Sequence, residues 1–318
     1  MKMSTTKNKQ VGAWIAIIVL IGAAFGSGYA LANMSTEGGA TATIGSITVI
    51  DGEGRTVTLT TTPNRIIVLT PGYAETLYAI GCGDNIIAVD NSTAQKGWPL
   101  EVRNKTTVGT ASAPSLEKII DLDPDLIIAY PYSRNALSSL ESNVPIYYVA
   151  YETSYEDVLG GILVAGLLTN RSSEAKSVVS TMQSKIDAIT SLTKDINKTA
   201  RPLVYYETSS VPGRCAGPNT LGNDLIYKAG GINIAADEPV AYPTLSNEYI
   251  IERSPDIILI TWYGQSIDDV KARSGWNSID AVKNSRVYKL SDISGVGPNA
   301  WMALEEVAKW LHPELFES

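Results

Sequence analysis

A segment of sixteen residues occurs twice in this chain, 131 positions apart. The first copy, SLEKIIDLDPDLIIAY, spans residues 115–130, and the second, SNEYIIERSPDIILIT, spans residues 246–261. They align without a gap, and seven positions are identical. Each copy has a serine that can cap a short helix, then a Pro-Asp turn, then an apolar run. This duplication predicts two halves of similar build.

Apolar runs near the first copy indicate strands of a parallel sheet. Residues 66–69 (IIVL) and 86–89 (IIAV) are short and continuously apolar, as expected of strands buried on both faces. A helix is expected between them at residues 74–80, and strands and helices continue to alternate. This pattern predicts an α/β fold with helices on both faces of a parallel sheet. Earlier in the chain, residues 47–51 and 56–59 alternate apolar and polar and predict a β-hairpin.

The two halves are separated by a segment that is predicted to be helical. Residues 155–168 favour one helix, and a longer helix is expected from Ser173. Its apolar residues recur every three or four positions, as on one face of a helix: Val178, Val179, Met182, Ile186, Ile189 and Leu192. We therefore expect an N-terminal lobe at 47–154, a helical linker at 155–200 and a C-terminal lobe at 201–318. A long helix would hold the lobes at a nearly fixed separation, with a cleft between them.

The first 46 residues predict export from the cytoplasm. Residues 11–32 are uncharged and mostly apolar, and Lys7 and Lys9 precede them. This segment is long enough to span a bilayer, with its N-terminal side in the cytoplasm. Its end also has the small-x-small form of a cleavage site, so residues 1–32 are a membrane anchor or a cleaved signal peptide. Residues 33–46 predict a flexible tether, and the lobes are expected outside the cytoplasm, anchored to the membrane or secreted.

Charge and rare residues argue against several functions. The formal net charge is −8, whereas nucleic-acid binding needs a basic surface. His312 is the single histidine, which argues against a Ser-His-Asp triad or a multi-histidine metal site. Cys82 and Cys215 form no C-x-x-C pair and are expected to be free thiols. The sequence therefore predicts a protein that is not an enzyme and has no metal or cofactor of its own.

Several ordered motifs resemble one protein family. They are TPGYAETL at 70–77, the two Pro-Asp strands, AGGINI at 229–234, GWNSIDAV at 275–282 and WLHPELF at 310–316. Together they resemble the iron-siderophore/cobalamin class of periplasmic binding proteins, over about residues 64–316. The resemblance implies the class III fold, in which two Rossmann-like lobes are joined by a long helix and the ligand lies in the cleft. It also implies delivery of the ligand to an ABC importer, which consists of a permease dimer and its ATPase.

The same resemblance implies one exposed glutamate on each lobe that pairs with arginines of the permease. The matching positions are Glu117 and Glu248, which are also equivalent in the internal repeat. Alternatively, each glutamate simply favours the positive end of a short helix, two residues after its capping serine. Both roles are compatible, because a side chain in a first helical turn is exposed.

Ligand contacts in such a fold come from loops at the carboxyl ends of the strands. These loops contain tyrosine and tryptophan, which offer rigid surface, and arginine, which binds carboxylates or phosphates. The expected ligand-binding residues are Tyr73, Tyr130, Tyr132, Arg134, Arg214, Tyr242, Trp262 and Tyr263. The alternative for each aromatic residue is ordinary packing at a strand end, and for Arg134 it is a solvated charge at a helix start.

The ligand is expected to be a metal that is already chelated. Without a histidine and cysteine cluster, direct coordination of a bare transition metal is disfavoured. A ferric siderophore is the first candidate, followed by a corrinoid or haem, and a small oxyanion bound by backbone amides is a further alternative. A secreted enzyme or an adhesion module on the same fold are the alternatives of another class, although no G-x-S-x-G elbow is present.

Overall fold

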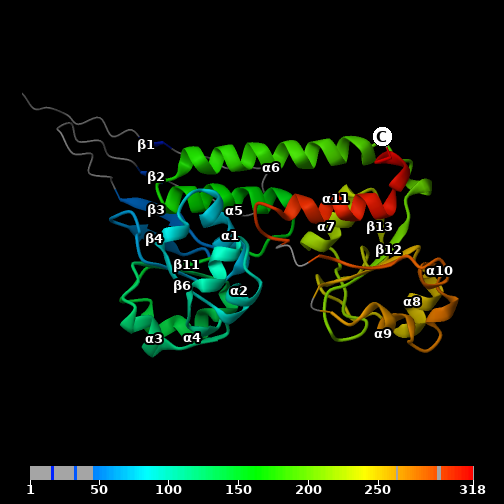
Figure 1. Cartoon of the computed structure of the whole chain (residues 1–318), viewed down its shortest axis with the longest axis horizontal. Coiled ribbons are helices and arrows are strands. Elements are labelled where there is room, and N and C mark those ends of the chain that lie inside the picture. The colour runs from blue at the N-terminus through cyan, green and yellow to red at the C-terminus, as the bar shows by residue number, and fades with distance from the viewer. Residues whose placement is uncertain (1–15, 18–31, 34–45, 263, 292–294, 318) are drawn as a thin grey trace, which may run out of the picture.

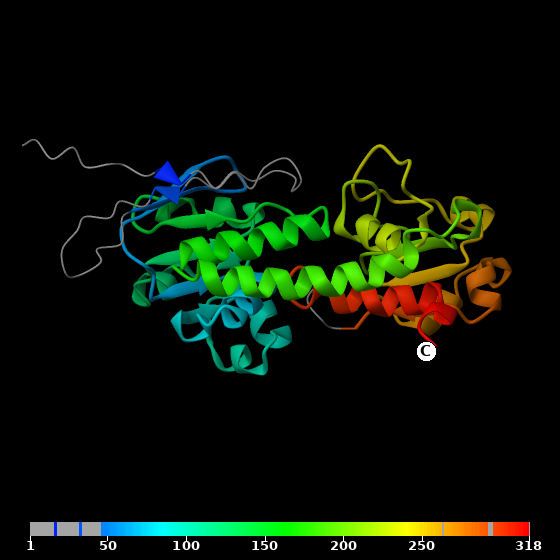
Figure 2. The ribbon, with the colours of Figure 1, turned by 90° about the horizontal axis from the view of Figure 1, so that it is seen from above.

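The computed structural model describes residues 16–17, 32–33, 46–262, 264–291 and 295–317. They form two α/β lobes that lie side by side, with one long helix along both (Figures 1 and 2). Near the N-terminus, β1 (Ala16–Ile17) pairs with β2 (Ala32–Asn33). The rest of the predicted anchor or signal segment lies outside the described residues. Within the described ranges, no helix has both the length and the apolar character that crossing a membrane requires.

The N-terminal lobe is built on a parallel sheet with the strand order β11-β10-β5-β6-β7. Its strands are β5 (Ile66–Val68), β6 (Ile86–Val89), β7 (Thr106–Thr107), β10 (Leu126–Ala129) and β11 (Ile146–Tyr148). The helices are α1 (Pro71–Ala79), α2 (Asn91–Lys96), α3 (Leu116–Asp121), α4 (Arg134–Leu137) and α5 (Tyr155–Leu168). One face of the sheet packs against α1 and α5, and the other against α3 and α4.

Two antiparallel hairpins accompany this sheet. The predicted one is present as β3 (Ile47–Ile50) and β4 (Thr56–Leu59), and a shorter one consists of β8 (Gly109–Thr110) and β9 (Ala113–Pro114). The helix expected at residues 74–80 begins three residues earlier, at Pro71. Proline is favoured in the first helical turn, because its missing N–H needs no partner there. Residues 71–73 therefore belong to a helix and not to a loop.

The C-terminal lobe has the same organisation, with a parallel sheet in the order β13-β12-β14-β15. Its strands are β12 (Leu203–Glu207), β13 (Ile232–Asn233), β14 (Ile257–Ile260) and β15 (Val287–Lys289). The helices are α7 (Leu221–Lys228), α8 (Asn247–Arg253), α9 (Ile267–Lys271), α10 (Asp280–Lys283) and α11 (Ala300–Leu311). Helices α7 and α11 cover one face, and α8, α9 and α10 cover the other. The predicted α/β class with parallel sheets is confirmed.

The internal repeat has the same structure in both lobes. In each copy the first serine accepts a hydrogen bond from a backbone N–H in the first turn of α3 or α8. The aspartate of each Pro-Asp turn then binds the backbone at the start of the neighbouring strand. Asp125 accepts from the N–H of Arg65 at 2.9 Å, and Asp256 accepts from the N–H of Leu203 at 2.7 Å. The repeated aspartate thus fixes the register between adjacent strands.

The two lobes share one hydrophobic core beneath α6 (Ser172–Thr193), the long helix of the linker. This helix has 22 residues and is therefore about 33 Å long. Its side chains Met182, Ile186 and Ile189 are buried in an apolar cluster that includes strands of both sheets. Helix α11 runs beside α6 (Figure 2). Leu192, which was expected on the apolar face, is 42% exposed, because the buried face of the helix continues from Ile189 to Thr193 and Leu192 lies at its edge.

Candidate ligand-binding site

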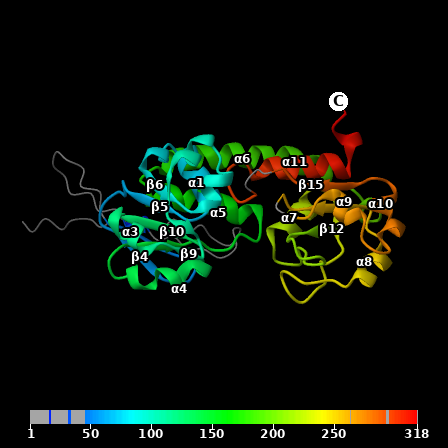
Figure 3. The same ribbon diagram turned by 60° about the horizontal axis from the view of Figure 1, so that its bottom comes forward.

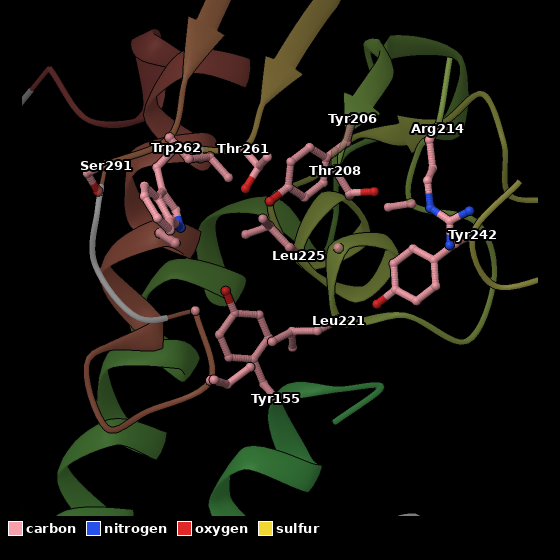
Figure 4. A pocket seen from close by; sticks show the side chains of 16 residues that line it. Tyr155, Tyr206, Thr208, Arg214, Leu221, Leu225, Tyr242, Thr261, Trp262 and Ser291 are labelled. Atoms are coloured by element: carbon pink, nitrogen blue, oxygen red, sulfur yellow. The ribbon is translucent and has the colours of Figure 1, made fainter. Parts of the chain in front are cut away.

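A cavity of about 450 Å³ lies where the linker meets the C-terminal lobe. Its walls come from the start of α5, the loops after β12 and β14, the first turns of α7 and the segment before α11 (Figure 4). The side chains labelled there are Tyr155, Tyr206, Thr208, Arg214, Leu221, Leu225, Tyr242, Thr261, Trp262 and Ser291. The cavity therefore lies at the carboxyl ends of parallel strands, where open α/β sheets usually bind ligands.

Arg214 and Tyr242 lie next to each other on one wall of the cavity (Figure 4). The Arg214 side chain is exposed, and its guanidinium has no hydrogen bond or ion pair with any residue that the structure describes. A guanidinium without a protein partner can bind a carboxylate or phosphate through two parallel hydrogen bonds. This wall therefore suits an anionic group of a ligand, flanked by an aromatic ring.

Tyr155 forms the floor of the cavity and was not among the expected ligand residues. Its hydroxyl donates to the backbone oxygen of Ala300 at 3.2 Å, and its backbone N–H donates to the Asp224 carboxylate at 2.9 Å. Burial raises the pKa of Tyr155 well above its ordinary value of 10.0, so the hydroxyl stays protonated. The sequence shows Tyr155 only as the first residue of a helix, and its contacts to the C-terminal lobe are not visible there.

On the N-terminal lobe, three tyrosines form an aromatic stack after β10 and β11. The ring of Tyr130 lies 5.4 Å from that of Tyr151, with 7° between the planes, and 5.8 Å from that of Tyr132. Tyr132 and Tyr151 are 52% and 56% exposed, so the stack presents flat aromatic surface to solvent. Tyr130 and Tyr132 were predicted, whereas Tyr151 was missed. Its position shortly after a buried strand was the available signal.

A partly buried carboxylate, Glu152, lies beside this stack. The Tyr130 hydroxyl donates to its Oε2 atom at 2.9 Å. Burial raises the pKa of Glu152 from 4.5 to about 7, although the hydrogen bond from Tyr130 acts in the opposite direction. Glu152 was also missed by the sequence reasoning, because nothing in the sequence indicates how deeply it is buried.

Tyr73 and Arg134, which were also predicted to bind the ligand, do not line the cavity at the C-terminal lobe. Tyr73 is 4% exposed and packs in the N-terminal core, with its ring 6.1 Å from that of Tyr147. Arg134 forms ion pairs with Glu53 at 3.1 Å and with Glu141 at 3.3 Å. Tyr263 lies outside the described residues. Tyr73 thus has the contacts expected of ordinary core packing, and Arg134 those expected of a surface charge at a helix start.

The lobes touch each other directly beside the cavity. Glu75 of α1 accepts a hydrogen bond from the backbone N–H of Asn299, just before α11, at 2.8 Å. A Cβ atom on Gly72 would lie 2.6 Å from the backbone oxygen of Val296, and one on Gly297 would lie 2.3 Å from a carboxylate oxygen of Glu75. Only glycine permits such close approach. Because Val296 also lines the cavity, this contact helps to set the cavity's shape.

Glu117 and Glu248, the predicted docking residues, are exposed on α3 and α8. Both helices lie on the side of the molecule away from α6 (Figures 1 and 3). Neither glutamate forms an ion pair with another residue in the described part of the chain. Their surroundings leave both carboxylates accessible to a partner.

Neither a group of potential metal ligands nor an exposed thiol is present among the described residues. Among them, no group of three or more histidine, cysteine, aspartate or glutamate side chains could hold a metal ion. Cys82 and Cys215 are buried free thiols. Burial raises the pKa of Cys215 from 9.0 to about 12, so its thiolate is disfavoured at neutral pH. Cys215 packs in the core of the C-terminal lobe.

The motifs and this two-lobed geometry agree with a known family. A family model described as "Periplasmic binding protein" matches residues 66–293. The chain belongs to the periplasmic binding protein family. Members of this family are extracytoplasmic solute-binding proteins of ABC transporters, and the resemblance to the iron-siderophore/cobalamin class is confirmed.

Three similar proteins show how far the likeness extends. The "Uncharacterized ABC transporter substrate-binding lipoprotein YvrC" of Bacillus subtilis is 27% identical over 317 residues, which is 97% of this chain and 99% of that protein. A "Cobalamin-binding protein" of Halobacterium salinarum is 31% identical over 262 residues, or 80% of this chain and 68% of that protein. The crystal structure of a possible iron-binding periplasmic solute-binding protein from Staphylococcus epidermidis has a TM-score of 0.68 and 29% identity. It covers 79% of this chain and 100% of that one.

Proposed function

We propose that this protein captures a metal chelate between its lobes and delivers it to the permease of an ABC importer. The observation that carries the proposal is the guanidinium of Arg214, which has no ion-pair partner among the described residues and lies in an aromatic cavity at the carboxyl ends of the strands. The tyrosine stack of the N-terminal lobe adds exposed aromatic surface on the other lobe. Aromatic surface and one cation suit a bulky ligand that has a rigid ring system and an anionic group.

For these walls we rank a corrinoid above a ferric chelate that carries several carboxylates, which reverses the order expected from the sequence. Arg214 is the one arginine or lysine among the described residues that line the cavity, and the remaining polar groups there are hydroxyl, indole and backbone groups. A cobalamin has a large ring system, neutral amide side chains and a single phosphodiester. A ferric chelate with several carboxylates would need more cations. The name of the halobacterial relative, a cobalamin-binding protein, supports the same order.

Ligand titrations test this proposal. The full-length protein would be titrated by calorimetry with cyanocobalamin, ferric citrate, a ferric hydroxamate siderophore, haemin and inorganic phosphate. We expect cyanocobalamin to bind at least about tenfold more tightly than the others. Arg214→Ala should weaken its binding by about tenfold to a hundredfold, the value of a hydrogen bond to a charged group. Arg171→Ala, which removes an exposed arginine at the start of α6, is the matched control and should change the affinity less than twofold.

The ranking of ligands can fail separately from the proposed transport function. Tighter binding of ferric citrate, siderophore or haemin would overturn the corrinoid assignment but keep a chelate-binding protein. Binding of phosphate alone would favour the oxyanion alternative. Absence of binding, or chemical turnover of a chelate, would contradict the proposed function.

We further infer that Glu117 and Glu248 contact the permease. They are exposed, they occupy equivalent positions in the two lobes, and their helices lie on the side away from α6. A permease dimer with twofold symmetry would offer each lobe the same basic patch. Reversing both charges (Glu117→Lys with Glu248→Lys) should abolish uptake in cells while the affinity for the ligand stays constant. Asp187→Lys, on the exposed side of α6, is the control; full uptake by the double variant would exclude the docking role.

A further inference from the structure

A buried ion pair lies at the end of β12, where the residues on both sides of Glu207 line the cavity. Glu207, the last residue of that strand, is 0% exposed. Arg273 donates from Nη1 to its Oε2 atom at 2.8 Å and from Nη2 to its Oε1 atom at 2.7 Å. The guanidinium also lies 4.5 Å from the centre of the Trp276 ring. Buried ion pairs are often no more stable than apolar pairs of similar volume, so stability alone does not explain this one.

The same carboxylate holds the backbone next to Arg214. Its Oε2 atom accepts hydrogen bonds from the Tyr205 hydroxyl at 2.9 Å and from the backbone N–H of Gly213 at 3.1 Å. Gly213 has a φ of +84°, and a Cβ atom there would lie 2.5 Å from the backbone oxygen of Leu245. The residue immediately before Arg214 is therefore fixed by Glu207 in a conformation that glycine favours.

Further backbone bonds extend this fixed conformation through the cavity wall. The N–H of Thr208 donates to the backbone oxygen of Arg214 at 3.1 Å, and the N–H of Cys215 donates to that of Pro243 at 3.0 Å. These bonds align the segment with β12 on one side and with the residues around Tyr242 on the other. Arg214 and Tyr242 are thereby brought together on one wall (Figure 4).

We propose that Glu207 is a positioning residue for ligand binding: oriented by Arg273, it holds the Gly213 amide and so aims the Arg214 guanidinium into the cavity. Glu207 is fully buried and is not among the described residues that line the cavity. When the backbone next to a long side chain is already fixed, less conformational entropy is lost as the side chain becomes ordered on the ligand. This role rests on the proposed function in one respect, namely that Arg214 binds an anionic group of the ligand.

The test removes the pair without leaving a buried charge. In Glu207→Met with Arg273→Met, both partners become apolar and the Gly213 N–H loses its acceptor. We expect the amides of residues 209–216 to exchange their hydrogens at least about tenfold faster, and the dissociation constant of cyanocobalamin to rise by about tenfold or more. Adding Arg214→Ala to this variant should weaken binding less than twofold further, because the guanidinium is already misplaced.

Two more variants separate positioning from general stability. Glu207→Gln with Arg273→Met restores an acceptor oxygen without the charge, and should recover the amide protection and most of the affinity. Asp51→Asn with Arg55→Met removes an ion pair of 2.9 Å around a buried carboxylate in the N-terminal lobe. This matched control should leave cyanocobalamin binding within twofold of the wild type.

Several results would overturn the positioning role. One is unchanged affinity and unchanged exchange at residues 209–216 in the double methionine variant. Another is a full additional loss from Arg214→Ala in that background. Faster exchange throughout the C-terminal lobe would reduce the pair to a structural element. If the wild-type protein binds none of the chelates, the proposed function fails, while amide exchange and its rescue by glutamine still decide whether Glu207 holds the loop.

Discussion

Replacing Glu152 with glutamine should make the stability of this protein less dependent on pH. The carboxylate is partly buried beside the tyrosine stack, and burial raises its pKa from 4.5 to about 7. Below pH 4.5 the carboxyl group is protonated in the native and the unfolded states. Between pH 4.5 and about 7, the native state keeps a proton that the unfolded state has released. The free energy of unfolding therefore falls as the pH rises through this range.

The size of the effect follows from the shift in proton affinity. Each tenfold change in proton affinity corresponds to about 1.4 kcal/mol. A pKa raised from 4.5 to about 7 corresponds to about 3.4 kcal/mol, and the partial exposure of Glu152 reduces the expected loss to about 2–3 kcal/mol. The glutamine variant cannot ionise and should escape this loss, so its advantage over the wild type should grow as the pH rises from about 4 to about 8.

Urea unfolding at a series of pH values, followed by tryptophan fluorescence, measures the difference between the two proteins. Tyr130→Phe provides a second check, because the Tyr130 hydroxyl donates to Glu152 and favours its ionised form. In Tyr130→Phe that hydrogen bond is missing, so the pH at which half of the stability loss has occurred should be higher than in the wild type. Tyr151→Phe removes a hydroxyl from the same stack and should leave the midpoint in place. If the free energies of unfolding of the wild type and Glu152→Gln differed by the same amount, within about 0.5 kcal/mol, from about pH 4 to about pH 8, that result would refute this reasoning.

Three further sets of substitutions test the packing and the site. Gly72→Ala should destabilise the protein by about 1–3 kcal/mol in urea unfolding, because its Cβ would overlap the other lobe. The control Gly160→Ala has open space in α5 and should be neutral or stabilising. Equal effects of the two substitutions would contradict the tight contact between the lobes. Asp125→Ala and Asp256→Ala should each cost about 0.5–1.5 kcal/mol, since each removes hydrogen bonding between the turn and the start of the neighbouring strand. A loss in one lobe only would show that the two copies of the repeat are not equivalent. Tyr151→Ala should weaken cyanocobalamin binding by about twofold to tenfold in calorimetry, because it removes an aromatic contact surface. Its stability should change little, because the ring is largely exposed. Unchanged binding would show that the tyrosine stack does not contact the ligand.

The secondary structure could be predicted from the sequence because it depends on local patterns. The strand at Ile86–Val89 and the helix at Tyr155–Leu168 have the predicted bounds, since apolar runs and helical periodicity involve neighbouring residues. The internal repeat likewise predicted two lobes of one design, and each copy forms the expected helix, turn and strand. Sequence motifs were also sufficient to indicate the family.

The binding site depends on contacts between residues that are far apart in the chain. Arg134 and Arg214 look alike in the sequence, but Arg134 pairs with Glu53, 81 positions away, whereas Arg214 has no such partner among the described residues. Glu207 and Arg273 are 66 positions apart, and their pairing is not signalled by any local motif. The sequence by itself therefore determined the elements, the two-lobed design and the family. Only the tertiary structure decided which charges are neutralised and which face the cavity, because ion pairing and burial depend on distances that the folded chain creates.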